Sequence, residues 1–166
     1  MRGMNFNMLE FRKITFDNVY KIVSLSVKEE QKNFVATNCE SLMEAYVAVT
    51  NNGVALPFGI YDGNEAVGFI MFGYDTLGDE DEPEVAEENY CLWRLMIDEK
   101  YQNKGYGKEA MKLAVDYMKS EPCGKAKLCW LSYEPENVKA KALYAANGFV
   151  ENGEVCGDEI VAIREL

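Results

Sequence analysis

The feature that most constrains this chain is an apolar run followed by two closely spaced glycines and a helical pattern. Residues 92–97 (Leu-Trp-Arg-Leu-Met-Ile) are apolar except for one arginine, as in a strand covered on both faces. From Lys108 onward, apolar residues recur at helical spacing. Gly105 and Gly107 lie at the joint, where the backbone can turn its N–H groups outward beside the positive end of the helix. The sequence therefore predicts a phosphate-binding joint between a strand and a helix.

The spacing of this joint, Gln-x-x-Gly-x-Gly at residues 102–107, separates it from two other phosphate-binding motifs. The P-loop pattern Gly-x-x-x-x-Gly-Lys-Ser/Thr is missing, and so is the dinucleotide pattern Gly-x-Gly-x-x-Gly. Directly after a strand that ends Met-Ile-Asp, the spacing resembles the pyrophosphate loop of the GNAT N-acetyltransferases, which use acetyl-CoA. An ordinary strand-turn-helix joint is the alternative interpretation.

A second motif follows later in the chain: Asn137-x-x-Ala140-x-x-Leu143-Tyr144-x-x-x-Gly148-Phe149. It resembles the C-terminal motif of the same family, where the Asn, Ala and Tyr line the pantetheine side of the cleft. The two motifs extend the resemblance over residues 90–150. It implies an α/β fold of the GNAT type: a mixed, mostly antiparallel sheet with one splayed parallel strand pair, and helices on both faces.

Local patterns predict the remaining elements of one domain over residues 1–166. Thr37 and Glu40 have the spacing of a capping box, with Leu42, Met43, Tyr46 and Val47 expected on one face of the helix that follows. An earlier helix is expected to begin at Thr15 or Asp17 and run to Val27. Strands are expected at 8–14, 57–61, 66–72, 92–97, 128–133, 149–154 and 159–164, and further helices after residues 107 and 137.

Composition excludes several classes of function. The net charge of −11 argues against nucleic acid or an anionic membrane as a partner. The chain has no histidine and no Cys-x-x-Cys, so we expect no metal site. Five cysteines, an odd number, fit free thiols in a reducing cytoplasm, and residues 1–7 hold no apolar run of signal-peptide length. The expected protein is a cytoplasmic enzyme acting on a small molecule.

The resemblance implies how the cofactor acetyl-CoA would bind. Its pantetheine arm would pair with backbone groups freed where strands 92–97 and 128–133 diverge, and one freed N–H would stabilise the oxyanion. Its pyrophosphate would meet the glycine loop, where two lysines add positive charge. The expected cofactor-binding residues are Leu95, Met96, Ile97, Gln102, Asn103, Lys104, Gly105, Tyr106, Gly107, Lys108, Asn137 and Tyr144.

The same resemblance implies direct attack of an amine on the thioester, without a covalent enzyme intermediate. Tyr144 is the expected general acid for the departing thiolate, and a core tyrosine on an amphipathic helix is the alternative. Because histidine is absent, the general base must be another group or a bound water. Glu88, just before the central strand, is the candidate base, with Glu84, Glu87 and Tyr90 as rivals. The alternative interpretation is that all of these are solvated loop residues.

Residues 77–90 carry seven carboxylates and no basic residue. Such a segment beside the acceptor cleft would attract a polycation. The chain also resembles the spermine/spermidine acetyltransferases of the family, notably in Leu-Trp-Arg-Leu-Met-Ile-Asp and Tyr-Gln-Asn-Lys-Gly-Tyr-Gly. A polyamine is the expected substrate, bound by Glu80, Asp81, Glu82 and Glu84. The alternatives are a protein N-terminus, a lysine, an aminoglycoside, or a non-catalytic acyl-CoA-binding module. The resemblance also makes a homodimer possible, through sheet edges or residues 159–166.

Overall fold

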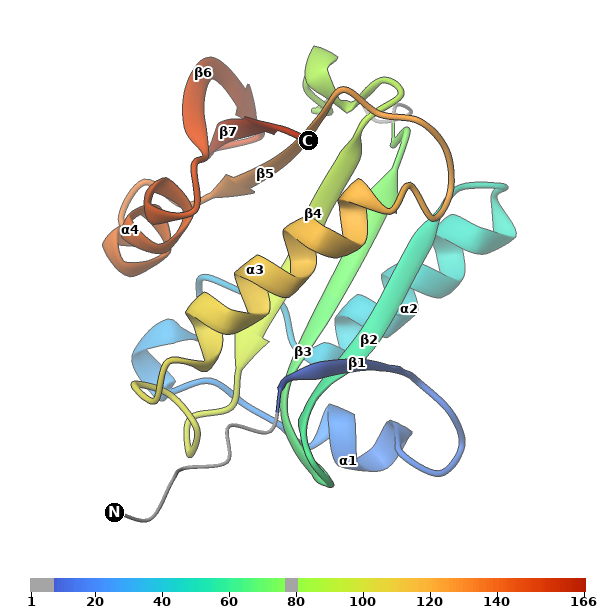
Figure 1. The fold of residues 1–166 in the computed structure, drawn as a ribbon, viewed down its shortest axis with the longest axis vertical. Coiled ribbons are helices and arrows are strands. Elements are labelled where there is room, and N and C mark those ends of the chain that lie inside the picture. Colours follow the sequence, from blue (N-terminus) through green and yellow to red (C-terminus); the bar gives the residue numbers. More distant parts are fainter. Residues whose placement is uncertain (1–7, 77–80) are drawn as a thin grey trace.

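A single mixed sheet forms the centre of the molecule. The computed structural model describes residues 8–76 and 81–166, and within these ranges seven strands pair in the order β1-β2-β3-β4-β5-β7-β6 (Figure 1). Every neighbouring pair is antiparallel except β4 and β5, which are parallel. The strands are β1 Glu10–Lys13, β2 Ala55–Asp62, β3 Glu65–Tyr74, β4 Tyr90–Ile97, β5 Leu128–Tyr133, β6 Val150–Cys156 and β7 Glu159–Glu165. The predicted mixed, mostly antiparallel sheet is confirmed.

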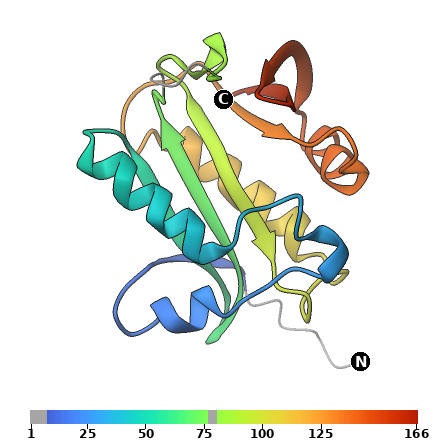
Figure 2. The same ribbon diagram turned by 180° about the vertical axis from the view of Figure 1, so that it is seen from behind.

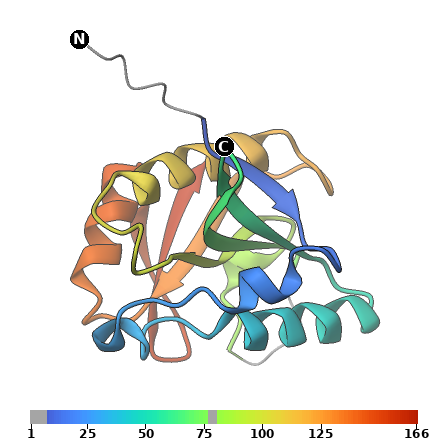
Figure 3. The ribbon, with the colours of Figure 1, turned by 90° about the horizontal axis from the view of Figure 1, so that it is seen from below.

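Helices cover both faces of this sheet, as the sequence predicted. Helices α1 (Val19–Val23) and α2 (Asn38–Thr50) lie on one face, and α3 (Tyr106–Lys119) lies on the other (Figures 2 and 3). Helix α4 (Val138–Ala146) follows β5 and contacts α3. Two short 3-10 helices, η1 (Glu29–Gln31) and η2 (Glu84–Ala86), complete the described elements.

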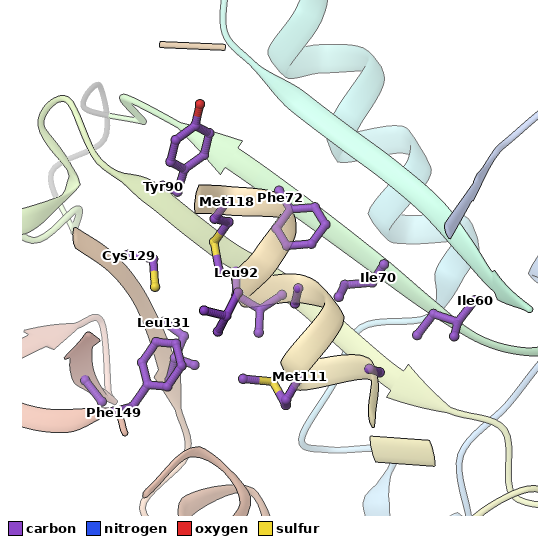
Figure 4. Close-up of a cluster of buried hydrophobic side chains, with 14 of the residues drawn as sticks. Ile60, Ile70, Phe72, Tyr90, Leu92, Met111, Met118, Cys129, Leu131 and Phe149 are labelled. Atoms are coloured by element: carbon purple, nitrogen blue, oxygen red, sulfur yellow. The ribbon is translucent and has the colours of Figure 1, made fainter. Parts of the chain in front are cut away.

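The main core lies between α3 and the sheet (Figure 4). Alanine and methionine on one face of α3 let the helix approach closely, and the aromatic and aliphatic side chains of the strands fill the remaining space. Each large side chain that is fully buried there contributes about 1.5–3 kcal/mol relative to the exposed state. The side chains in contact include Ile70, Phe72, Tyr90, Leu92, Met111, Met118 and Leu131.

Strands β4 and β5 pair over a short distance only. The register joins Tyr90 with Cys129 and Cys91 with Trp130, and no later pair follows. On its other side, β4 continues to pair with β3 as far as Ile97, with a bulge that leaves Trp93 without an opposite residue. The two parallel strands therefore diverge after Cys91, which confirms the predicted splayed pair.

The two helices before β2 differ in part from the sequence prediction. The capping box of α2 is present: Thr37 is the N-cap, and its N–H and hydroxyl bond the carboxylate of Glu40. The buried face is made by Asn38, Ser41 and Ala45, whereas Met43, Tyr46 and Val47 are exposed. Small residues lie beneath the helix because only they permit close packing on the sheet.

Helix α1 is shorter than predicted and begins elsewhere. It spans five residues, with Asn18 at the N-cap rather than Thr15 or Asp17. Asn18 instead accepts a hydrogen bond from the N–H of Thr15 and donates one to the carbonyl of Lys13, so it shapes the turn that follows β1. Ile22 is the buried residue of α1, and Tyr20 is 82% exposed. The helical pattern therefore predicted the element but not its length.

The outer edges of the sheet are β1 and β6. Strand β7, which contains most of residues 159–166, pairs with β5 on one side and β6 on the other. The segment that the resemblance suggested for dimerisation is therefore internal to the sheet. In the parts of the chain that the structure describes, no helix has the length and apolar character needed to cross a membrane.

Candidate active-site cleft

A cleft of about 1470 Å³ opens where β4 and β5 separate. The α2 side of β4 and β5, the loop after β4, and the first turns of α3 and α4 all contribute to its walls. Helix α2 and the segment before it form the opposite wall, and residues from the ends of β3 and β6 close one end. The separation of the two strands thus creates an elongated site. It has room for an extended ligand and for a second molecule in contact with that ligand.

The backbone of β4 faces this cleft at alternate residues. The N–H of Asp98 donates to the carbonyl of Val67 on β3 (2.9 Å), so the backbone groups of Asp98 and Met96 point toward β3. Those of Leu95 and Ile97 point the other way, toward the side from which β5 has diverged. All three of the predicted residues line the cleft, but the strand geometry presents the backbone of Leu95 and Ile97 rather than that of Met96.

Gln102 fixes the loop that follows β4. Its side-chain amide donates to the carbonyl of Ile97 (3.0 Å) and to Oε1 of Gln31 in η1 (2.8 Å). The carbonyl of Ile97 therefore already has one donor, whereas in the described part of the chain β5 does not pair with the backbone of Leu95. Through these two hydrogen bonds, Gln102 connects the end of β4 with η1 on the opposite wall of the cleft.

The glycine loop has the geometry that the sequence predicted. Asn103 (φ 61°) and Gly105 (φ 88°) both adopt left-handed conformations, and Gly105 is the N-cap of α3 with no side chain capping it. The first N–H groups of α3 have no partner within the helix and carry its positive potential. Asn103 and Gly107 line the cleft, whereas Lys104, Gly105 and Lys108 are exposed at its border.

Tyr106 anchors the start of α3 to the sheet. Its hydroxyl donates to Oδ2 of Asp62 at the end of β2 (2.6 Å). That hydrogen bond, together with burial and the charge of Asp62, raises the pKa of Tyr106 to about 12. The phenol therefore stays protonated and positions the loop, and its ring forms part of the cleft wall.

Helix α4 brings Asn137 and Tyr144 to the far wall. Asn137 is the N-cap, and its Oδ1 accepts from the N–H of Ala140 (3.3 Å). Tyr144 lies two turns later, between the rings of Tyr133 and Phe149 at centroid distances of 5.7 and 6.2 Å. Both Asn137 and Tyr144 line the cleft. Burial, and then the charge of Glu159, raise the pKa of Tyr144 to about 12, so the phenol keeps its proton at neutral pH.

The predicted acidic residues divide between cleft and surface. Glu82 lines the cleft, where its Oε2 accepts from the hydroxyl of Thr76 (3.2 Å). Asp81 and Glu84 are exposed and do not line it; the N–H of Glu84 donates to Glu154 on β6 (2.7 Å). Glu80 lies outside the described residues.

Glu88, the candidate base, is exposed and lies outside the cleft. It has a left-handed backbone (φ 52°), and its N–H donates to Oδ1 of Asp75 (2.9 Å). Glu88 is thus a neighbour of the cleft-lining Asp75 but does not itself line the cleft. The structure gives no support to Glu88 as the base.

Four carboxylates that the sequence analysis did not select also line the cleft. Glu44 on α2 pairs with Arg94 of β4 (2.7 Å), so this arginine neutralises an acid of the opposite wall rather than one in its own strand. On the far side, the hydroxyl of Ser132 donates to Oε2 of Glu159. No local motif indicated these pairs, because they join residues from distant elements. The four residues are Glu40, Glu44, Asp75 and Glu159.

The floor of the cleft contains two buried donors with unmet hydrogen-bonding capacity. Within the described part of the chain, neither Nε of Arg94 nor Nε1 of Trp130 has a hydrogen-bond partner. Trp130 is only 3% exposed. A buried donor without a partner costs about 1–3 kcal/mol. Both residues line the cleft, while the two donor atoms themselves are covered from solvent.

Comparisons with known proteins agree with this architecture. The model of the acetyltransferase (GNAT) family matches residues 20–149. A spermine/spermidine N(1)-acetyltransferase of Bacillus subtilis (strain 168) is 31% identical over 161 residues, 95% of this chain and 99% of the relative. A probable spermine N(1)-acetyltransferase of Bacillus subtilis subsp. natto is 30% identical with the same coverage.

Solved structures show the same fold at lower sequence identity. The spermidine N-acetyltransferase of Vibrio cholerae, in complex with CoA and spermine, superposes with a TM-score of 0.67 and 18% identity over 96% of this chain and 95% of the other. An aminoglycoside acetyltransferase in complex with coenzyme A gives 0.76 and 14%, over 95% and 94%. The match to the family model covers most of the chain and includes both sequence motifs. The chain therefore belongs to the GNAT family of acetyltransferases.

Proposed function

We propose that this protein transfers the acetyl group of acetyl-CoA to a primary amine of a polyamine such as spermidine or spermine. The observation that carries the proposal is the cleft between the separated strands β4 and β5. Leu95 and Tyr144 both line it, and so do several carboxylates, which supports the proposal. The curated relatives that share about 30% identity are named for the same reaction class.

The donor would lie along β4 with its pyrophosphate at the start of α3. The N–H and carbonyl of Leu95 would bond the pantetheine amides or the thioester oxygen, where an N–H stabilises the developing oxyanion. The uncapped N–H groups after Gly105 would receive the pyrophosphate. Lys104 and Lys108, exposed at this border, would add positive charge to the same anion.

The reaction requires no bond between the acetyl group and the protein. A neutral amine attacks the thioester carbonyl, the C–N bond forms, and the C–S bond breaks as CoA leaves as a thiolate. Tyr144 donates a proton to that thiolate and recovers one from the newly formed, still protonated amide nitrogen. Its pKa of about 12 ensures that the phenol carries the proton before the reaction begins.

The charge of the acceptor half of the cleft supports a polycation. Five carboxylates line the described part of the cleft, against three cations: Lys32, Arg94 and Lys139. Arg94 is already paired with Glu44. Excess negative charge in a concave site raises the local concentration of a cationic substrate and holds its distal ammonium groups.

The direct test is release of free CoA, read with a thiol reagent, when purified protein is given acetyl-CoA and a panel of amines. Spermidine and spermine are expected to give the highest kcat/KM, ahead of a monoamine, a lysine peptide and an aminoglycoside. Turnover of only a peptide or an aminoglycoside would replace the proposed acceptor. CoA binding without turnover on any amine would indicate a non-catalytic acyl-CoA-binding module.

Glu82→Gln is expected to raise the KM for spermine by about two- to fivefold while leaving that for a monoamine nearly unchanged, because a partly exposed charge pair contributes about 0.2–1 kcal/mol. The matched control is Glu84→Gln in the same segment, where the side chain lies outside the cleft. Equal changes in KM for the two variants, or for the two substrates, would show that Glu82 acts only through the overall charge of the surface.

We also propose that the protein is cytoplasmic and that residues 1–166 act as one domain. All five cysteines are free thiols, which supports a reducing compartment. If a homodimer forms through a sheet edge, we propose β6 as that edge, because it is the outer strand beside the cleft and exposes Val150 and Val155. The mass of the protein in solution tests this assembly.

A further inference from the structure

Glu159 lies in the part of the cleft wall that β7 contributes. It is the first residue of β7, directly after the tight turn at residues 157–158 that joins β6 to β7. Its side chain is half-buried and lines the cleft beside Ser132, which is on β5 beyond the point where β4 and β5 separate. The hydroxyl of Ser132 donates to Oε2 of Glu159. The carboxylate is therefore held at one position against the far wall.

Four other carboxylates line the described part of the cleft, and each has partners of its own. Glu82 accepts from the hydroxyl of Thr76 (3.2 Å). Glu40 closes the capping box of α2 by accepting bonds from Thr37 (2.9 and 2.7 Å). Glu44 is paired with Arg94, and Asp75 accepts the N–H of Glu88. Within the described residues, Glu159 has no lysine or arginine within ion-pair distance.

An amine acceptor must lose a proton before it attacks, because alkylammonium groups have pKa values near 10. We propose that Glu159 is the general base of the acetyl transfer, taking that proton directly or through one water, with Ser132 as its positioning residue. The proposal rests on the acetyl transfer proposed above and assigns a proton acceptor to it. Glu88, on the exposed bend before β4, has no place in this step.

Proton balance couples Glu159 to Tyr144. The ammonium gives its proton to the carboxylate of Glu159, and the free amine displaces CoA as a thiolate, which takes the proton of Tyr144. The phenolate then recovers a proton from the protonated amide nitrogen, and Glu159 releases its proton to water. The charge of Glu159 raises the pKa of Tyr144. Once Glu159 is protonated that charge is lost, so Tyr144 becomes a stronger acid at the moment when the thiolate forms.

Other titratable groups near Glu159 do not compete for the proton. Besides Tyr144 on α4, Cys156 on β6 is a titratable neighbour of Glu159. The pKa of the Cys156 thiol is raised to about 11, first by burial and then by the charges of Glu82, Glu159 and Asp81. A thiol that is fully protonated at neutral pH cannot accept the proton of an ammonium ion. Glu82, which faces Cys156 from the other side, lies in the segment before β4.

Glu159→Gln is expected to lower kcat with spermidine at pH 7 by about 100-fold or more, since general base catalysis contributes about 10²–10⁴. The amide keeps the size of the side chain and can still accept the hydrogen bond from Ser132. The loss should shrink as pH rises toward 10, because the free amine then forms without a base. The KM for acetyl-CoA should not change. Ser132→Ala should lower kcat with spermidine while leaving the KM for acetyl-CoA unchanged, since the carboxylate of Glu159 is then no longer held in position.

The matched control is Glu165→Gln, an exposed glutamate on the same face of the same strand, which should retain wild-type activity and pH profile. A second measurement needs no substrate: ¹³C-tyrosine NMR, with Tyr144→Phe to assign the signal. In Glu159→Gln the pKa of Tyr144 should fall. A wild-type rate and pH profile in Glu159→Gln would overturn the proposal, as would an unchanged Tyr144 pKa.

If spermidine is not the acceptor, the result differs from the one expected if Glu159 is not the base. In the first case the wild-type protein does not turn over spermidine at all, and the rate comparison is made with whichever amine of the panel is acetylated. If no amine is acetylated, Glu159 has no proton to accept and the proposal falls together with the function. If spermidine is acetylated by wild type and Glu159→Gln alike, only the assignment of Glu159 fails.

Discussion

Tyr144→Phe is expected to lower kcat for acetyl transfer by about 100-fold or more, because it removes the proton donor for the departing thiolate. The pKa of Tyr144, raised to about 12, means that wild-type enzyme carries this proton throughout the neutral range. The ring itself is packed between Tyr133 and Phe149, and phenylalanine keeps those contacts. Binding of acetyl-CoA should therefore survive the substitution.

Steady-state kinetics with spermidine, together with CoA affinity by calorimetry, separate the two effects. A lower kcat with unchanged CoA affinity identifies a group that acts in the transition state. Tyr133→Phe is the matched control: its hydroxyl donates to Glu151 on β6 (2.6 Å), outside the reaction path, so a small loss of activity is expected. A wild-type rate in Tyr144→Phe would assign Tyr144 to the core alone.

Gly68→Ala is expected to destabilise the protein by about 3 kcal/mol and to weaken acetyl-CoA binding. A Cβ on Gly68 of β3 would lie 2.3 Å from the backbone oxygen of Met96 on β4. Backbone cannot rotate away as a side chain does, so β3 and β4 must shift apart. Leu95, the neighbour that faces the cofactor side, would move with Met96. For a chain of this size the loss corresponds to a fall of roughly 6–12 °C in Tm.

Gly73→Ala on the same strand is the control for Gly68→Ala. Its Cβ would approach the Cγ2 methyl of Thr76 (2.7 Å), which is a side-chain atom that can turn aside. A smaller change in Tm is expected, with unaltered CoA affinity. Thermal unfolding and calorimetry on the two variants give the answer. Equal effects at both positions would mean that the contact with β4 is not what requires glycine at residue 68.

The donor half of the site was predictable because its chemistry lies in contiguous sequence. The loop at residues 102–107 and the motif that begins at Asn137 each form one local unit, so strand, turn and helix patterns placed them correctly. The divergence of β4 and β5 followed from the family resemblance and is confirmed by the register. Strand periodicity alone could not have distinguished Leu95 from Met96, because the direction of the backbone groups depends on the pairing with β3.

The acceptor half was less predictable because it is assembled from distant segments. The pairs Arg94 with Glu44 and Ser132 with Glu159 join residues that are 50 and 27 positions apart, and no periodic pattern encodes such contacts. The acidic segment before β4 suggested the charge of the substrate, yet Glu88 is exposed and does not line the cleft. Likewise, the apolar spacing of α2 did not indicate that its buried face is made of small residues, because close packing on the sheet requires them there.

The central claim is that the cleft passes an acetyl group directly from acetyl-CoA to a polyamine. It is tested most directly by mixing the protein with equimolar acetyl-CoA and excess spermidine, quenching at short times, and measuring the masses of protein and amine together. Direct transfer predicts that acetylated spermidine and free CoA form in equal amounts at every time point. The mass of the protein should stay unchanged throughout. Acetylated protein that forms and then disappears, or CoA release without acetylated amine, would contradict it.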